Sequence, residues 1–342
     1  MHLLNYFSYL CAIIKTISAM KKLNIITISV FSLILSACGG KSVDITVPDN
    51  NCPSDKELVE KALKGDEQAG LKMAQMYYNG EGVIQDYTEA IKWYRVLSEK
   101  GNPYAQYYMG ICHDEGRGLE ASLTKAMEYY KQSFLEFKAR AEKGDKEAML
   151  YLGKMYSLGK YVTKDKAAAV KWYREAAEQG DAKAQYTLGV CYEEGTGVAQ
   201  SFSEAVKWYR QAADQGHAEA QCALGACFEE GKGVEASATE AVKWYRLSAE
   251  QGNADAQCNL GYCFDEGIGV EKSPSEAVNL YRLSAEQGNA TAQNNLAYCY
   301  EYGTGVEKNM EEAIKWYKKS AKQGDEGAIA NLRSKGITDY ND

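Results

Sequence analysis

The chain has 342 residues, of which 45% are hydrophobic and 25% are charged, and its formal net charge is −8 at pH 7. Residues 1–37 contain three Lys and no acidic residue, so the remainder holds 36 basic and 47 acidic side chains, a net charge of −11. This excess argues against nucleic acid as a partner, because cationic side chains drive that binding.

The first 37 residues carry targeting information. Residues 1–19 are apolar and aromatic and precede a second methionine, Met20. We expect translation to start at Met20, and an unusually long leading region is the alternative. Residues 20–37 have a basic start at Lys21 and Lys22 and a short apolar core at residues 23–35. This pattern is typical of a secretory signal and is too short to favour a transmembrane span.

The signal ends in Leu35-Ser36-Ala37-Cys38, which resembles the bacterial lipobox. The resemblance implies that Cys38 is lipidated and becomes the new N-terminus; the alternative is an ordinary signal peptide with a chance cysteine. Gly39 follows Cys38, and by similarity to enterobacterial lipoproteins this favours anchoring in the outer membrane, facing the periplasm.

Residues 38–54 contain turn-forming residues and no helical period, which predicts a flexible tether behind the lipidated cysteine. Residues 55–65 resemble the end of a helix, and we expect them to cap the following array.

The unit of that array is clearest at residues 181–216. Ala184, Leu188 and Tyr192 form the stripe of one amphipathic helix, helix A, and Gly195 follows it. A capping box from Ser201 opens a second helix, helix B, with an apolar stripe of its own. Neither helix buries its stripe alone, so neighbouring units must stack.

The unit recurs over residues 66–325 with a period of 36 residues. The tryptophans that mark this period are Trp172, Trp208, Trp244 and Trp316. A fixed period of this length predicts an all-α solenoid of about seven 36-residue helix-turn-helix repeats. We expect Trp208 and Leu224 to be buried in it. Residues 326–342 should form a C-terminal capping helix and tail.

Two repeats depart from the pattern. The second has seven extra residues near 131–143, about two helical turns, which should lengthen helix B without changing its phase. Phe134 and Phe137 lie in this extension, either in a simple longer helix or as an exposed apolar ledge for a partner. The third repeat has Tyr161 in place of the second loop glycine.

The recurring pattern, A-x-x-x-L-G-x-x-Y-x-x-G-x-G-V followed by A-x-x-W-Y-x-x-A-A-x-x-G, resembles the Sel-one-like repeat (SLR) family, a relative of tetratricopeptide repeats. The resemblance implies a right-handed α/α superhelical solenoid that acts as an interaction scaffold, and it names no ligand. In tetratricopeptide-like arrays helix A lines the concave groove. The helix A positions not expected to be used for packing are Tyr107, Tyr108, Ile111, Tyr186, Thr187, Val190, Asn259, Tyr262, Asn294, Asn295 and Tyr298.

No catalytic or metal-binding constellation is visible. The three histidines, His2, His113 and His217, are not spaced as metal ligands, and no nucleophile has an evident base. We expect His113 to be a packed core residue. We therefore expect no enzyme activity, metal or cofactor.

Five cysteines, Cys112, Cys191, Cys227, Cys263 and Cys299, share one helix A position, and two more, Cys222 and Cys258, share another. The pairs Cys191–Cys222 and Cys227–Cys258 are compatible with disulfides in an oxidising periplasm. Disulfide-rich members of the resembled family instead place cysteines at the end of helix B, where this chain has Ala177, Ala213 and Ala249. The pairing stays open.

Acidic pairs recur at the end of helix A, as in Glu193/Glu194 and Asp265/Glu266. Acidic residues there oppose the helix macrodipole, so the pairs form either a solvated rim or an acidic edge that faces a basic partner.

Our leading hypothesis is a monomeric, lipid-anchored envelope scaffold that binds a protein or peptide in its groove. By resemblance to some SLR lipoproteins, a periplasmic immunity protein that neutralises a toxin is the alternative. A penicillin-binding or hydrolytic enzyme, to which a few relatives are linked, is the least favoured.

Overall fold

The computed structural model describes residue 47 and residues 51–340. The predicted signal peptide, Cys38 and most of the tether lie outside these residues. All regular secondary structure in the described part is helical. The helices are α2 (Lys56–Leu63), α3 (Glu67–Asn79), α4 (Tyr87–Glu99), α5 (Pro103–Glu115), α6 (Leu123–Ala141), α7 (Lys146–Leu158), α8 (Lys166–Glu178), α9 (Ala182–Glu194), α10 (Phe202–Asp214), α11 (Ala218–Glu230), α12 (Ala238–Glu250), α13 (Ala254–Glu266), α14 (Pro274–Glu286), α15 (Ala290–Tyr302), α16 (Met310–Lys322) and α17 (Glu326–Ser334).

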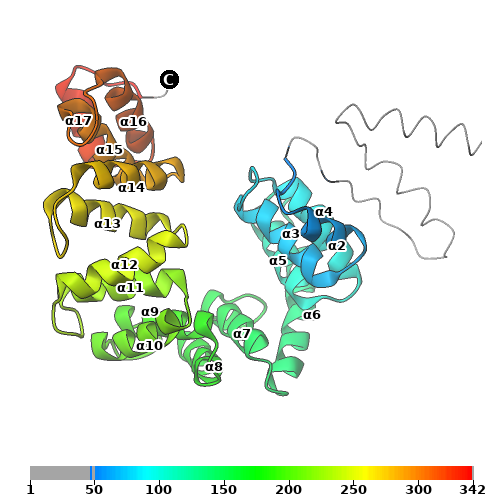
Figure 1. Cartoon of the computed structure of the whole chain (residues 1–342). Helices are drawn as coiled ribbons and strands as arrows, with labels where there is room; N and C mark the ends of the chain where they lie inside the picture. Colours follow the sequence, from blue (N-terminus) through cyan, green and yellow to red (C-terminus); the bar gives the residue numbers. More distant parts are fainter. Residues whose placement is uncertain (1–46, 48–50, 341–342) are drawn as a thin grey trace, which may run out of the picture. The chain divides into compact units, whose positions relative to one another are not determined.

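The odd-numbered helices from α3 onward are the A helices and the even-numbered ones the B helices. Each helix packs on the next along the chain, as the consecutive helices from α7 to α17 show (Figure 1). This confirms the predicted all-α solenoid. The chain divides into two compact units, and the boundary between them in the sequence falls inside α6, between Ser133 and Phe134.

The ends of each helix follow from local chemistry. In α9, the Asp181 carboxylate accepts a hydrogen bond of 2.8 Å from the Ala184 amide, and Gly195 ends the helix in the left-handed conformation at φ 69°. The next glycine, Gly197, lies against the first turn of α8 in the preceding repeat. A Cβ atom there would overlap the carbonyl oxygen of Lys166, so this loop position requires glycine.

Each repeat is closed by a tyrosine of helix B that packs on a glycine of helix A. Tyr245 is fully buried against Gly225, as Tyr209 is against Gly189. Leu224 is fully buried, as predicted. The prediction for Trp208 is met only in part: the adjacent Tyr209 occupies the core and Trp208 as a whole is half-buried, although its indole Nε1 is buried.

The seven extra residues lengthen α6 to 19 residues, against 13 in the regular B helices. The first half of α6 places Tyr130 against Gly110 of α5. The second half places Phe137 on Tyr151 of α7, with ring centroids 5.1 Å apart, and Phe134 on Tyr161, at 5.4 Å.

The hypothesis of an exposed phenylalanine ledge on α6 was therefore wrong. Phe134 is 8% exposed and Phe137 is fully buried, because two helical turns bring the extra residues back into the packing phase. Tyr161, in place of a loop glycine, packs on Phe134.

The described end of the predicted tether is docked and not free. Val47 is buried against the core of the first unit. The Asn51 side chain accepts a hydrogen bond from the Ile84 amide at 2.7 Å and donates one to the Ile84 carbonyl at 2.8 Å. The Tyr77 hydroxyl donates to the Asn51 carbonyl at 2.8 Å. These contacts fix the chain against the loop between α3 and α4.

Candidate partner-binding surface

The A helices bury one stripe and leave another open. In α13, Ala256, Leu260 and Cys263 are buried, whereas Tyr262 and Glu266 are exposed. Residues three and four apart share a helix face, so Asn259, Tyr262 and Glu266 lie along one open stripe.

The predicted groove residues of the second unit fall mostly on this open stripe. Tyr262 is 44% exposed and Tyr298 is 48% exposed. Asn259 and Asn295 are half-buried and lie one turn before the two tyrosines. Asn294 is also half-buried, but its side-chain oxygen accepts a hydrogen bond of 3.3 Å from Asn331 of α17. Asn294 thus helps to hold the terminal helix.

The predicted groove residues of the first unit lie elsewhere. Tyr107 is only 4% exposed, so its assignment to an open surface was wrong. Tyr108 is half-buried and stacks on Tyr94 at 5.0 Å, and it meets Tyr78 edge to face at 5.3 Å. Ile111 also packs against the core of this unit. Large aromatic side chains on neighbouring helices here bury one another, which the spacing alone does not reveal.

Tyr186 is half-buried, and its ring stacks on the imidazole of His217 in the next repeat at 5.1 Å. The Thr187 hydroxyl donates a hydrogen bond of 2.7 Å to the Lys183 carbonyl of its own helix. Val190 is half-buried. This part of the A-helix surface is therefore partly occupied by contacts within the array.

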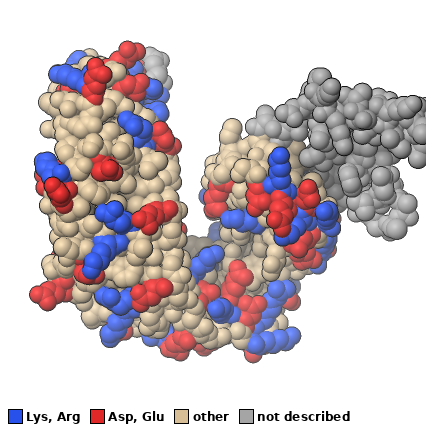
Figure 2. All heavy atoms as spheres, in the orientation of Figure 1, with Lys and Arg blue, Asp and Glu red and all other residues tan. Residues whose placement is uncertain are grey.

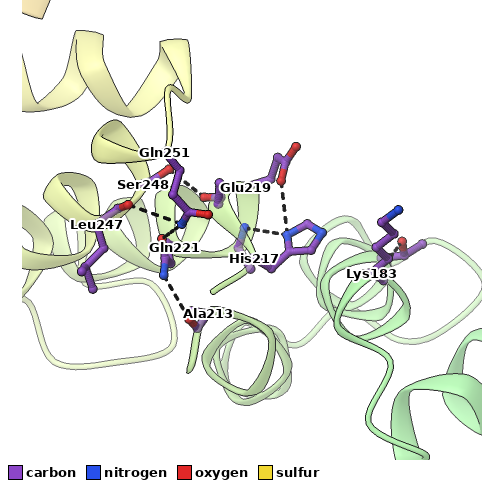
Figure 3. Close-up of polar contacts among 11 residues, drawn as sticks. Lys183, Ala213, His217, Glu219, Gln221, Leu247, Ser248 and Gln251 are labelled. Atoms are coloured by element: carbon purple, nitrogen blue, oxygen red, sulfur yellow. Dashed lines mark hydrogen bonds and ion pairs between the residues drawn. The ribbon is translucent and has the colours of Figure 1, made fainter. Parts of the chain in front are cut away.

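His217 begins α11 where other repeats have Asp or Asn. Its Nδ1 atom accepts a hydrogen bond of 3.3 Å from the Ala220 amide, and the same atom lies 3.3 Å from a Glu219 carboxylate oxygen (Figure 3). Burial lowers the pKa of His217; the carboxylate of Glu219 opposes this shift and the ammonium of Lys183 adds to it. His113, as predicted, is a packed core residue, stacked on Tyr129 at 5.7 Å.

A ladder of buried glutamines joins the repeats of the second unit. The Gln221 side chain donates a hydrogen bond of 3.1 Å to the Ala213 carbonyl of α10 and accepts one of 2.7 Å from Gln251, the residue that caps the C-terminus of α12 (Figure 3). The equivalents of Gln221 that bond in the same way are Gln185, Gln257 and Gln293. Ser248 adds a bond of 2.7 Å to the Ala218 carbonyl. Our sequence analysis missed this ladder, although a glutamine follows the helix A alanine at the 36-residue period.

The acidic pairs divide into two roles. The first carboxylate usually accepts a hydrogen bond from the buried tyrosine of helix B, as Glu229 does from Tyr245 at 2.6 Å and Glu193 does from Tyr209. This bond explains why an acid stands at an unfavourable helix end. The second residue, such as Glu230 or Glu266, is exposed.

Cys191, Cys222, Cys227 and Cys258 are free thiols, so neither Cys191–Cys222 nor Cys227–Cys258 is a disulfide in this structure. Burial raises the pKa of Cys222 to about 12 and that of Cys191 to about 11. The thiols are therefore protonated at neutral pH and serve as small apolar side chains.

Tyr302 is a surface residue that the sequence analysis missed. It is 59% exposed, and its ring lies 4.4 Å from that of Tyr298, one turn earlier on α15. Tyr302 occupies the place of the second acid in four of the other repeats, Glu115, Glu194, Glu230 and Glu266, and this break in the acidic pattern is the signal that points to it.

Acidic and basic side chains are interspersed on the face of the second unit drawn in Figure 2, without one large field of either sign. The described residues contain no group of three or more potential metal ligands. No described helix combines the length and apolar character that crossing a membrane requires.

The fold and this surface define an all-α repeat solenoid, a class of protein built from stacked helix pairs. The model of the Sel1 repeat matches residues 69–102, 103–134, 146–181, 182–217, 218–253, 254–289 and 290–325. The chain therefore belongs to the Sel1 repeat family, which confirms the resemblance seen in its sequence. Sel1 repeats generally mediate protein–protein interactions.

Similar structures include a protective antigen of uropathogenic Escherichia coli strains with an SLR fold, at 36% identity and a TM-score of 0.55. That match covers 83% of this chain and 61% of the antigen. A Sel1 repeat protein from Oxalobacter formigenes is 40% identical, with a TM-score of 0.57, over 62% of this chain and 87% of its own.

Among curated proteins, the ERAD-associated E3 ubiquitin-protein ligase component HRD3A of Arabidopsis thaliana is 32% identical over 88 residues. That match covers 23% of this chain and 13% of the plant protein. It reflects shared repeats over a small part of a longer protein.

Proposed function

We propose that this chain is a lipid-anchored scaffold of the bacterial envelope, which binds a partner protein through the open face of its A helices. The observation that carries the proposal is the exposed group Tyr262, Tyr298 and Tyr302 on α13 and α15. Tyrosine offers a large rigid contact area with a polar tip, which suits protein recognition.

The proposal assigns no catalytic role to the chain. Of the histidines in the described part, His113 is packed on Tyr129 and His217 caps a helix. The buried thiols are held in the protonated form, in which they are poor nucleophiles. These placements favour a binding protein over an enzyme.

The lipid anchor rests on the sequence around Cys38, and outer-membrane attachment facing the periplasm is part of the proposal. The test is labelling of the expressed chain with a radioactive fatty acid. Cys38→Ala should abolish the label. Cys52→Ala should keep it, because Cys52 lies 14 residues later and is exposed. Equal labelling of both variants would contradict the anchor.

The partner-binding role is tested by capture from the envelope of the bacterium that encodes the chain. One variant replaces the three tyrosines with alanine. A control replaces Leu247 and Leu283, the exposed leucines of α12 and α14, with alanine; they are 45% and 50% exposed. We expect only the tyrosine variant to lose its partner. Loss in the control alone would place the binding face on the B helices.

The identity of the captured protein separates the two hypotheses left open by the sequence. An envelope component would support the scaffold. A secreted toxin whose activity the chain blocks would support an immunity protein.

A further inference from the structure

Four exposed side chains lie at equivalent positions of the A helices α13 and α15, and we call them the tyrosine–carboxylate patch: Tyr262, Glu266, Tyr298 and Tyr302. Tyr262 and Glu266 lie one turn apart on α13, and Tyr298 and Tyr302 occupy the same two positions on α15. The two helices are in contact at their N-terminal ends, where the Asn289 side-chain amide donates a hydrogen bond of 2.8 Å to the Asp255 carboxylate. The repeat geometry therefore brings all four onto one face.

The electrostatics of this face favour a cation. Helix α13 contains three acidic residues, Asp255, Asp265 and Glu266, and no Lys or Arg. The single charged residue of α15 is Glu301. Asp255 is bonded to Asn289, and Glu301 is held by Lys335 at 2.8 Å and by the Tyr317 hydroxyl at 3.0 Å.

Asp265 and Glu266 are left at the edge of the patch. Among the described residues, no cationic side chain lies within ion-pair distance of either, whereas Glu230 in the preceding repeat pairs with Lys232. Burial raises the pKa of Asp265, the neighbouring Glu266 raises it further and Lys272 opposes the shift. A ligand cation would relieve the repulsion between the two carboxylates.

We propose that the tyrosine–carboxylate patch binds an arginine side chain of an extended segment in the partner protein. The planar guanidinium stacks on aromatic faces and forms paired bonds with a carboxylate, and the patch supplies both. Asn259 and Asn295, one turn earlier, are half-buried, and their amides can donate to and accept from an extended backbone. The inference rests on the proposed partner-binding function and specifies its chemistry.

The probe is a fluorescent nonapeptide of alternating arginine and serine, titrated against the full chain at low ionic strength. A second peptide carries citrulline, which has the shape of arginine without its charge. We expect the arginine peptide to bind and the citrulline peptide to bind at least about tenfold more weakly, with binding reduced by added salt.

Glu266→Gln and Tyr262→Ala should each raise the Kd about 3- to 30-fold, the range for a lost charge or cation–π contact. The matched control is Glu230→Gln. Glu230 has the same helical position, but Ala226 stands where α13 has Tyr262. The control should bind the peptide as the unmodified chain does.

Equal binding of the two peptides, or an equal loss in Glu230→Gln and Glu266→Gln, would overturn the inference. So would binding of a soluble glycan that depends on Tyr262 without any arginine peptide binding. If envelope capture depends on the tyrosines but charge does not matter, only the arginine chemistry fails. If capture ignores the tyrosines, the proposed function itself fails.

Discussion

At Gly225, in the middle of α11, a single methyl group would collide with a ring of the neighbouring helix. A Cβ atom there would lie 2.7 Å from Tyr245, closer than carbon atoms approach in folded proteins. Glycine normally weakens a helix interior. Here the close crossing of the two helices outweighs that cost, and the same contact recurs in the other repeats that have glycine at this place.

Gly225→Ala should therefore destabilise the second unit, by about 1–3 kcal/mol for an overpacked core site. The control is Gly70→Ala in α3, where the added Cβ would meet Leu97 and Trp93 at an ordinary 3.6 Å. That change should be neutral or stabilise by about 0.5–1 kcal/mol through helix propensity. Urea unfolding followed by circular dichroism measures both. A neutral Gly225→Ala would refute the close-packing explanation.

His217 gives the array a pH dependence with a defined sign. Because burial lowers its pKa, the folded chain binds the proton less readily than the unfolded chain. The contribution of His217 to folding stability should be fully present above the ordinary histidine pKa of about 6.5. This contribution should fall as the pH drops from about 6.5 through the lowered pKa of His217. The protonated ring can no longer accept the hydrogen bond from the Ala220 amide and forms an ion pair with Glu219 instead.

His217→Asn, which matches the caps Asn253 and Asn289 of the next repeats, should weaken this pH dependence. The remaining dependence should come from other groups, including His113, whose pKa is also lowered by burial. Thermal midpoints between pH 7.5 and 5 measure the difference. His217→Ala serves as the control that loses the cap at every pH. Parallel curves for unmodified chain and His217→Asn would contradict the assignment.

At the scale of the helix, the glutamine ladder ties three successive helices together. Gln221 is 5% exposed and joins α10 to α12 through one side chain. Gln221→Ala should cost about 1–3 kcal/mol, the range for a buried group that loses its partners. Gln200→Ala is the control, because that exposed amide bonds only the Glu193 carbonyl of its own repeat. The control should stay within about 0.5 kcal/mol.

Amide hydrogen exchange in α10, α11 and α12 measures both variants. We expect faster exchange across all three helices for Gln221→Ala and a local change for Gln200→Ala. Similar exchange in the two variants would mean that the ladder contributes no coupling between repeats.

The helices and their phase are predictable from sequence, because a 36-residue period and the Ala184–Leu188 stripe fix which face is buried. The sequence does not predict which of several large side chains fills a given space in the core. The spacing placed Tyr107 on the open face, but the aromatic cluster of the first unit buries it. Tyr209 rather than Trp208 fills the core, because only the tyrosine lies against Gly189.

The candidate surface was predicted in part. Tyr262 and Tyr298 lie on the open stripe as expected, whereas Asn294 is engaged by Asn331 of the terminal helix. That contact joins side chains 37 residues apart, and helical periodicity carries no information about it.

At the scale of the whole molecule, the main helix–helix contacts of the described residues join helices that are consecutive in the chain, so stability is carried locally along the array. Leu224→Ala removes a fully buried side chain of α11 and should cost about 2–5 kcal/mol. Protection against hydrogen exchange should fall most in α10 to α12 and least in α16 and α17. Leu247→Ala, at a site 45% exposed, is the control and should stay within about 0.5 kcal/mol.

Unfolding should also depart from a single cooperative step. Tryptophan fluorescence and circular dichroism should give different midpoints in the Leu224→Ala variant. Coincident midpoints, with protection lost evenly over the second unit, would show that it unfolds as one block.

The constant offsets of the glutamine ladder have a consequence for the gene. Loss of codons 218–253, one whole repeat, would bring Gln257 to the place of Gln221, facing Ala213 as it now faces Ala249. Each ladder hydrogen bond lost by the deletion would be replaced by an equivalent bond, so no buried glutamine amide at the junction would be left without a partner. Unequal recombination between such similar segments can thus shorten or lengthen this chain in steps of 36 residues, while a deletion inside the ladder whose length is not a multiple of 36 would leave the ladder out of register.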